Sequence, residues 1–392
     1  MRGILALRGA GMGLDEAALQ EAIPMRGRMI HGLDGSQSSQ AYGVNGEYIN
    51  SVDRGRLNML LLDAAEQLPN VCIQFDHKMV HCQMETGTLV LETGSSSERR
   101  SFSETFDFIV GADGAFSAVR RELMRRTRMN YQQTYIEHCY RELTIHPILD
   151  EQGDQQFAMD PNHLHIWPKM SYMMIALPNL DKSFTCTLFM PEEKFEAIRD
   201  RSDLVTFFRS EFPDALRLMG EEGLCREYFA NPLGSLMSVK CTPYHYRDRG
   251  VILGDAAHSM VPFYGQGMNA GLEDVGILRD MLQRYPNSLA DALNAYTAHR
   301  HPDAEAICDL AMQNYVEMRA HVRSPIYLAR KYVEGMLHRV FPQLVVPLYT
   351  MVSFTTIRYS EATRRSQRQG RILAICTAII LLSILGIVSL RA

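Results

Sequence analysis

Apolar side chains recur with helical spacing early in the chain. Downstream of Asp53, leucines and alanines fall three or four positions apart over Leu57–Leu68. This spacing predicts a helix that Asp53 caps and Pro69 ends. The runs at 71–75 and 89–91 are short and rich in strand-forming residues, so we expect a strand at each.

A strand that leads into a glycine occurs twice. The run FDFIV at 106–110 meets Gly111 and is followed by a helical pattern near Ser117, which predicts a buried strand, a turn and a helix. The run 250–253 repeats this pattern, and nearly everything after Gly267 has helical spacing. This alternation is typical of an α/β fold.

The residues between these two segments have a different pattern. From about 131 to 240, aromatic and β-branched runs such as HLHIWP, SYMMIAL and SFTCTLFM are broken by Pro and Asn. We expect a separate, mostly antiparallel sheet inserted into the α/β part. The expected regions are a first α/β region at 1–130, the inserted sheet at 131–245, the second α/β region at 246–300, a helical region at 301–363 and an apolar segment at 372–390.

The C-terminal segment 372–390 contains no charged residue. As a helix it would rise about 28 Å, enough to span a bilayer, and this prediction is favoured over a buried core helix. Arginines precede the segment at 364, 365, 368 and 371, and only Arg391 follows it, so we expect the body to face the cytosol. The region Met1–Ile30 matches neither a secretory signal nor a mitochondrial presequence.

Composition and charge exclude several classes of protein. The chain is 46% hydrophobic and 22% charged, with a net charge of -5. These values exclude a disordered chain, a collagen and a polycationic nucleic-acid binder. The eight cysteines form no CxxC pair, so we expect reduced, mostly buried thiols and neither a disulfide framework nor a metal site.

Two glycine-rich loops carry the candidate chemistry. In GADGAFSAVR, at 111–120, the glycines permit close approach of a ligand, and we expect free amides at a helix N-terminus to face phosphate. In the loop 249–275, Asp255 comes just after a predicted strand, and Gly265 and Gly267 stand at the start of the next predicted helix. The glycines at 9, 11 and 13 lack a preceding strand and are not a convincing dinucleotide motif.

The sequences of these two loops, and the inserted sheet expected between them, resemble those of the flavoprotein aromatic hydroxylases. Segments such as IPMRGRMIH, NHLHIWP, NYVEMRAHV and PLYTMVSF are similar to the kynurenine 3-monooxygenase family in particular. The resemblance implies FAD and NADPH as cofactors, molecular oxygen as co-substrate, and a C-terminal anchor in the mitochondrial outer membrane. Family members begin with a βαβ unit that carries GxGxxG, and we expect this chain to begin after it.

The implied fold is α/β. It comprises an N-terminally truncated, Rossmann-like FAD-binding domain with an inserted antiparallel β-sheet substrate domain, C-terminal helices and a transmembrane tail. By the same resemblance, FAD is bound by Arg54, Met79, Asp255, Met268 and Asn269. Taken alone, Arg54 and Met79 are equally consistent with a solvated and a packed side chain.

The resemblance also implies the substrate contacts Arg28, Tyr42, Asn314 and Tyr349, with Arg28 suited to a carboxylate because its planar fork pairs two oxygens. Glu317 and Met318 are expected to line the same pocket. His163 and His165 alternate on a predicted strand, and packed histidines are favoured over a metal site. The arginines at 120, 121, 125, 126 and 128 fit either NADPH phosphates or a solvated helix face.

The implied activity is hydroxylation of L-kynurenine, a small aromatic amino acid, to 3-hydroxy-L-kynurenine, a step towards NAD biosynthesis. No nucleophile or metal is expected, because the flavin carries the chemistry. Two alternatives remain open: a membrane-anchored flavin monooxygenase or epoxidase with another substrate, and an inactive truncated remnant. No nucleic-acid partner is expected.

Overall fold

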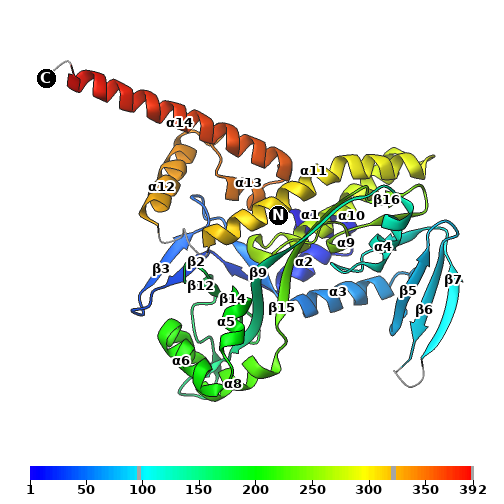
Figure 1. Cartoon of the computed structure of the whole chain (residues 1–392), viewed down its shortest axis with the longest axis horizontal. Coiled ribbons are helices and arrows are strands. Elements are labelled where there is room, and N and C mark those ends of the chain that lie inside the picture. Colours follow the sequence, from blue (N-terminus) through cyan, green and yellow to red (C-terminus); the bar gives the residue numbers. More distant parts are fainter. Residues whose placement is uncertain (95–98, 319–323, 390–392) are drawn as a thin grey trace.

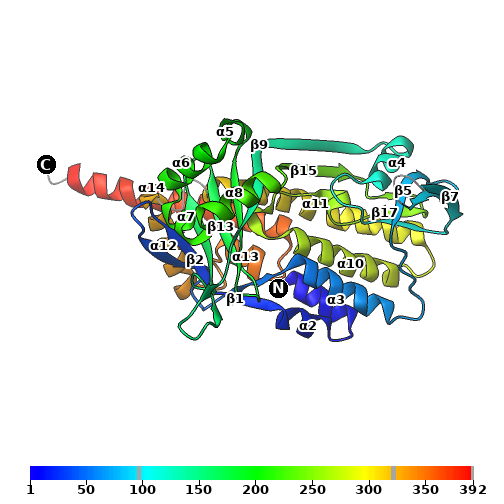
Figure 2. The same ribbon diagram turned by 90° about the horizontal axis from the view of Figure 1, so that it is seen from below.

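The structure is a computed structural model that describes residues 1–94, 99–318 and 324–389. Within the last of these ranges, the side chains of 325, 326, 330, 374 and 376–389 are outside the description. The described chain forms an α/β part, a large sheet covered by helices, and a C-terminal helical part from which α14 projects (Figures 1 and 2).

The first segment is helical and leads into short strands. It contains α1 (Arg2–Ala10), α2 (Leu14–Gln20), the antiparallel pair β1 (Ala22–Met25) and β4 (Ile49–Val52), and α3 (Arg54–Glu66). The expected helix after Asp53 is confirmed, since the Asp53 carboxylate accepts a hydrogen bond of 2.8 Å from the Arg56 amide at the start of α3.

The expected strand at 71–75 is wrong, whereas that at 89–91 is confirmed. The structure has an antiparallel sheet of β5 (His77–Gln83), β6 (Thr88–Thr93) and β7 (Arg100–Thr105). Residues 71–75 precede it without a pairing partner, and Phe75 is exposed. Strand propensity is not sufficient without a ladder of hydrogen bonds to a neighbour.

Both strand–glycine segments form strands as predicted, and the structure pairs them with each other. β8 (Ile109–Gly111) pairs in parallel with β17 (Gly250–Ile252), which also pairs with β16 (His245–Tyr246). Helix α4 (Ala118–Arg126) follows β8, and α9 (Asp255–His258) follows β17. The expected buried strand at 106–110 is shorter than predicted, because Phe106 and Val110 are exposed and only Ile109 enters the core.

The large sheet has seven strands in the order β15-β9-β14-β13-β12-β2-β3. All its pairs are antiparallel except β12 with β2. Its strands are β2 (Gly27–His31), β3 (Gln37–Ala41), β9 (Asn130–Ile145), β12 (His163–Pro168), β13 (Met173–Pro178), β14 (Phe184–Pro191) and β15 (Gly234–Thr242). A short pair, β10 (Ile148–Leu149) and β11 (Gln155–Gln156), lies beside it. The N-terminal strands β2 and β3 thus complete the inserted sheet.

Each face of this sheet carries a hydrophobic core. One core, around Trp167, Leu188 and Phe208, lies under α5 (Glu192–Ala197), α6 (Arg201–Glu211), α7 (Pro213–Met219) and α8 (Glu221–Ala230). The opposite core, around Ile166 and Phe189, includes residues of the C-terminal helices. The sheet therefore presents β2 and β12 to those helices.

The C-terminal part is helical, as predicted. It contains the 3-10 turn η1 (Pro262–Tyr264), α10 (Gly267–Arg284), α11 (Leu289–Val316), α12 (Pro325–Val340), α13 (Leu348–Phe354) and α14 (Tyr359–Ser389). Among the described residues, no helix combines the length and the apolar run that a membrane crossing needs. The predicted span 372–390 lies almost entirely outside those residues, because few of its side chains are described.

Candidate active site

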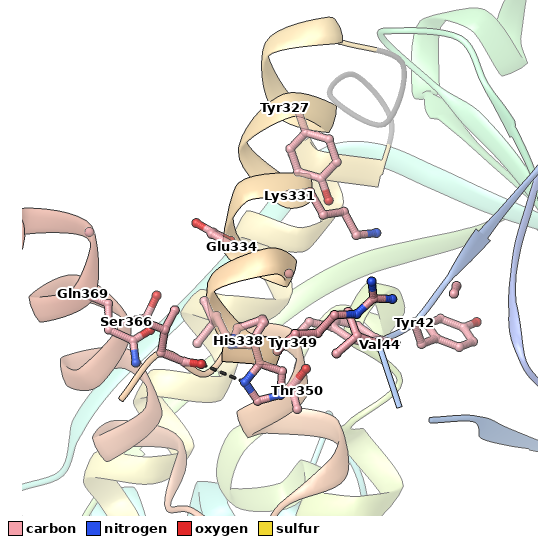
Figure 3. Close-up of a pocket in the computed structure, with 18 of the residues that line it drawn as sticks. Tyr42, Val44, Tyr327, Lys331, Glu334, His338, Tyr349, Thr350, Ser366 and Gln369 are labelled. Atoms are coloured by element: carbon pink, nitrogen blue, oxygen red, sulfur yellow. Dashed lines mark hydrogen bonds between the residues drawn. The ribbon is translucent and has the colours of Figure 1, made fainter. Parts of the chain in front are cut away.

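A cavity of about 530 Å³ lies where the end of β3 meets α12, α13 and α14 (Figure 3). We name it the Arg28 cavity. Its polar and aromatic lining includes Arg28, Tyr42, Glu317, Tyr327, Lys331 and Tyr349. Three of the four predicted substrate contacts, which are far apart in sequence, therefore line one cavity.

Arg28 lies on β2 and is only 4% exposed. Its Nη1 is 3.8 Å from Glu317 Oε1, and its guanidinium lies 5.0 Å from the centre of the Tyr349 ring. Its Nε is buried and has no hydrogen-bond partner. Burial by itself lowers the pKa of Arg28, but the acidic groups around it, Glu317 among them, raise it overall, so the side chain is a permanent cation.

Three tyrosines form an aromatic wall beside this cation. The Tyr42 and Tyr349 rings stack with centroids 5.6 Å apart, and Tyr264 stacks on Tyr349 at 5.5 Å. The Tyr42 hydroxyl is buried without a hydrogen-bond partner. Burial raises the pKa of both Tyr42 and Tyr349, which keeps their hydroxyls neutral. A flat apolar surface and an unused hydroxyl beside a cation suit an aromatic acid.

Asn314 occupies a different position from the other three predicted contacts. It is buried on α11, and its Nδ2 donates to the Phe263 carbonyl at 2.6 Å and contacts Met318 Sδ at 3.4 Å. Neither Asn314 nor Met318 is among the residues that line the Arg28 cavity, whereas Glu317 is. In this structure the Asn314 side chain links α11 to η1.

Helix α12 supplies lining residues that the sequence analysis missed. Tyr327 donates a hydrogen bond to Glu317 Oε1, and the side chain of Lys331 extends into the cavity (Figure 3). Burial, and then the charge of Arg28, lower the pKa of Lys331 to about 8, while Glu317 opposes the shift. A signal was present: Tyr327, Lys331, Glu334 and His338 follow helical i, i+4, i+7, i+11 spacing.

Asp255 follows β17 as the first residue of α9. Its side chain is solvent-accessible, and no described residue forms a hydrogen bond with the carboxylate. Partial desolvation raises the pKa of the Asp255 carboxyl; His258 opposes the shift and Asp274 adds to it. The preceding Gly254 adopts φ 55°, and its amide donates to Asp274 Oδ2 at 2.8 Å, which holds the turn in place.

The N-terminus of α10 lies next to this turn, because Gly254 and Gly271 approach closely. No side chain caps the helix, and a Cβ added at Gly265 or Gly267 would meet nothing within 4 Å. An uncapped helix N-terminus, open space and a free carboxylate fit a group that has hydroxyls and an electron-rich ring edge, as FAD does.

The other predicted FAD contacts are distributed over several elements. Met268 is exposed at the start of α10, whereas the Asn269 side chain accepts from the Gly3 amide at 3.0 Å and so joins α1 to α10. Arg54 is exposed on α3, where its Nη2 lies 3.2 Å from Glu142 Oε1. Met79 is half-buried on β5. The structure thus brings together Asp255, Met268 and Asn269, and places Arg54 and Met79 on other elements.

The expectation of free amides at the helix after GADG is wrong. Asp113 accepts hydrogen bonds from the Ala118 and Val119 amides at 2.6 and 3.1 Å, and Ser117 Oγ accepts from the Arg120 amide at 2.9 Å. The N-terminus of α4 is therefore already capped by its own chain, and a phosphate would have to displace Asp113.

The arginines of α4 divide between two roles. Arg120 is buried and donates to the carbonyls of Ala256 and Ala115 at 2.7 and 2.6 Å, which fastens α4 to α9. Arg125 pairs with Glu122 and Arg126 with Glu85. The exposed side chains of Arg121 and of Arg128, which lies just after the helix, remain accessible to an anion.

The two histidines of β12 are held by protein groups. His165 is buried, with Nδ1 2.9 Å from His31 Nε2 and Nε2 2.9 Å from the Asp160 carbonyl oxygen. His163 contacts Asp160 and Ser39. Among the described residues, no three His, Cys, Asp or Glu side chains are placed to hold a metal ion.

Comparison with known proteins supports a flavin site. A family described as "FAD binding domain" matches residues 7–311. A kynurenine 3-monooxygenase from Sus scrofa is 45% identical, over 95% of this chain and 77% of the relative. One from Yarrowia lipolytica is 48% identical, over 95% and 81%. A probable FAD-dependent monooxygenase from Pseudomonas aeruginosa has a similar fold, with a TM-score of 0.62 and 21% identity over 85% of this chain and 87% of that one. The predicted α/β FAD-binding fold is confirmed.

Proposed function

This chain belongs to the kynurenine 3-monooxygenase family of FAD-dependent enzymes, and we propose that it hydroxylates L-kynurenine to 3-hydroxy-L-kynurenine with NADPH as reductant. One observation of the structure carries the substrate assignment. A buried arginine with an unpartnered Nε lies against stacked tyrosines in a cavity of about 530 Å³.

The charges of the Arg28 cavity match both ends of an α-amino acid. Arg28 binds the carboxylate, because its guanidinium pairs two oxygens at once. Glu317, 3.8 Å from Arg28, accepts from the α-ammonium group. The aromatic ring packs against the stacked Tyr42 and Tyr349 rings, which orient it in the cavity.

FAD, when bound, supplies the oxygen activation and the electron transfer. Asp255 accepts hydrogen bonds from the hydroxyls of its sugar-like chain, and the uncapped N-terminus of α10 stabilises negative charge on the ring edge. Met268 and Asn269 flank that helix start. Arg54 and Met79 remain proposed FAD contacts from the family resemblance, and Arg121 and Arg128 are candidates to attract NADPH phosphates.

A hydrocarbon substrate is less compatible with this cavity. Arg28 is buried, and an epoxidase substrate would give its guanidinium no group to pair with. The lipid epoxidase alternative therefore leaves the buried Nε of Arg28 without a partner and Glu317, 3.8 Å from Nη1, as its counter-charge.

We also propose a C-terminal anchor in the mitochondrial outer membrane, with the body in the cytosol. Support comes from the uncharged segment 372–390, from the continuation of α14 to Ser389, and from the four arginines that precede the segment.

The test begins with the full chain purified in detergent and loaded with FAD. We expect a flavin absorbance spectrum, NADPH oxidation that kynurenine stimulates, and 3-hydroxykynurenine by mass spectrometry. A folded but colourless protein would support an inactive remnant. A coloured protein whose NADPH oxidation ignores kynurenine would point to another substrate.

A further inference from the structure

Helix α12 presents two different faces. Tyr327, Lys331, Glu334 and His338 line the Arg28 cavity, whereas Tyr332, Val333 and Met336 are exposed on other sides of the helix. Because residues four apart share a face of a helix, the direction of Lys331 is set by the helix as a whole. Figure 3 shows its ammonium group directed to the side of the cavity that holds Tyr349 and Tyr42.

No described residue forms a hydrogen bond or ion pair with the Lys331 ammonium group. The carboxylate that raises its pKa, Glu317, already accepts a hydrogen bond from Tyr327 and lies 3.8 Å from Arg28 Nη1. The charged and titratable groups that line the cavity with Lys331 are Arg28, Tyr42, Glu317, Tyr327, Glu334, His338, Arg339 and Tyr349. Lys331 is thus a cation beside a second cation.

This environment makes the ammonium form of Lys331 less stable than that of an exposed lysine. Burial and the charge of Arg28 both act against the ammonium form, and they lower the pKa of Lys331 to about 8. A carboxylate brought between Arg28 and Lys331 has the opposite effect, because a nearby negative charge favours the ammonium form.

We propose that Lys331 is a second anchor for the substrate carboxylate, and that any Lys331 still neutral takes up a proton as the substrate binds. In each molecule in which Lys331 starts as the neutral amine, its nitrogen gains one proton from solvent. The substrate carboxylate remains an anion and then faces two cations. No bond of the substrate changes. This inference rests on the proposed function, since it names how the substrate's acid group is selected.

The direction of the pH dependence follows from linkage. A group whose pKa rises on binding contributes affinity that is complete below its free pKa and lost as the pH rises above it. With a free pKa of about 8, Lys331 is half protonated at that pH, so binding takes up about half a proton there and almost none near pH 6. Affinity therefore declines above pH 8, while Arg28 keeps its charge throughout.

The experiment is calorimetric titration of the FAD-loaded full chain with L-kynurenine, near pH 6 and near pH 8, in buffers of different ionisation enthalpy. The variation of the measured heat with buffer gives the number of protons taken up. The proteins are wild type, Lys331→Met, Lys331→Arg and, as a control, Lys78→Met, which changes an exposed lysine on β5. A second ligand, the kynurenine analogue without its α-amino group, removes titration of the ligand's own amine.

We expect about half a proton of uptake near pH 8 in wild type and in Lys78→Met, and none in the two Lys331 variants. Lys331→Met should bind roughly ten- to a hundredfold more weakly near pH 6, as for a lost hydrogen bond to a charged group. Lys331→Arg should retain most of the affinity, which also shows that the site is folded.

Two results would overturn this inference, and they differ. If wild type and Lys331→Met bind kynurenine with equal proton uptake and equal affinity, Lys331 is not an anchor, although the proposed function stands. If wild type binds no kynurenine at all while its flavin is retained, the proposed function fails and this inference fails with it.

Discussion

Replacement of Arg28 by alanine is the sharpest test of the substrate assignment. Arg28 is 4% exposed, its nearest carboxylate oxygen is 3.8 Å away on Glu317, and its Nε has no protein partner. The Nε donor of Arg28 is therefore unused until a ligand arrives. The variant removes this cation and leaves the desolvated substrate carboxylate without its paired guanidinium, with Lys331 as the remaining cation in the cavity.

The expected loss is large. Breaking a buried charge pair by removing one partner costs on the order of 3 to 5 kcal/mol, which corresponds to a loss of affinity of roughly a hundredfold to a few thousandfold. Arg28→Lys should recover part of this, because an ammonium restores the charge but not the two parallel hydrogen bonds. FAD affinity should not change, since Arg28 is on β2 and the proposed flavin contacts are on α3, β5, α9 and α10.

The assay is titration of flavin fluorescence with kynurenine in wild type, Arg28→Ala and Arg28→Lys. Arg26→Ala is the matched control, because Arg26 lies two residues earlier in the same RGR sequence but is exposed. We expect Arg26→Ala to bind like wild type. Equal affinities in all four proteins would refute the assignment and would make Arg28 a structural arginine.

Three further predictions concern the flavin, the pH dependence of stability and the membrane. Asp255→Asn should weaken FAD binding about ten- to a hundredfold, because the hydroxyls of the FAD sugar-like chain lose a charged acceptor. The flavin retained on dialysis measures this, and Asp248→Asn, at an exposed position, is the control. Burial lowers the pKa of His165 to about 4. As the pH drops from about 6.5 to 4, the unfolded state gains a proton that the folded state does not, so the free energy of unfolding should fall by about 3 kcal/mol. Urea titrations of wild type and His165→Gln measure how this free energy depends on pH. Deletion of 372–392 should release the protein from membranes, as measured by fractionation.

Each of these predictions has a result that would contradict it. Unchanged flavin retention in Asp255→Asn would remove the role assigned to the α9 turn. Identical pH slopes in wild type and His165→Gln would mean that other groups dominate acid unfolding. A truncated body that still pellets with intact outer membranes, and not as aggregate, would show a second point of attachment.

Local features of the sequence were sufficient for much of the fold. The helix after Asp53, the parallel strands beside Gly111 and Gly254, and the antiparallel sheet all follow from spacing, caps and turn residues that act over a few positions. The loop that carries Asp255 was likewise identifiable, because its strand, glycines and helix are contiguous. The family resemblance then pointed to Arg28, Tyr42 and Tyr349, which the structure brings into one cavity.

The strand expected at 71–75 and the free amides expected at α4 illustrate the limit of local reasoning. A strand forms only where a neighbour supplies a hydrogen-bonding edge, and that edge lies beside 77–83. The α4 amides were expected to be free, but Asp113 folds back on them. Both outcomes depend on which groups meet in space, and composition at the element itself does not determine that.

The same distinction holds for the cavity. Spacing shows that Tyr327 and Lys331 share one face of a helix, but not that this face meets Arg28 from β2 and Glu317 from the end of α11. The shift in the pKa of Lys331 depends on that meeting, because desolvation and the charge of Arg28 act only at close range. The sequence by itself determined the elements and the residue types available for chemistry. Only the tertiary structure decided which of those residues face the same space, because packing brings together side chains that lie hundreds of positions apart in the chain.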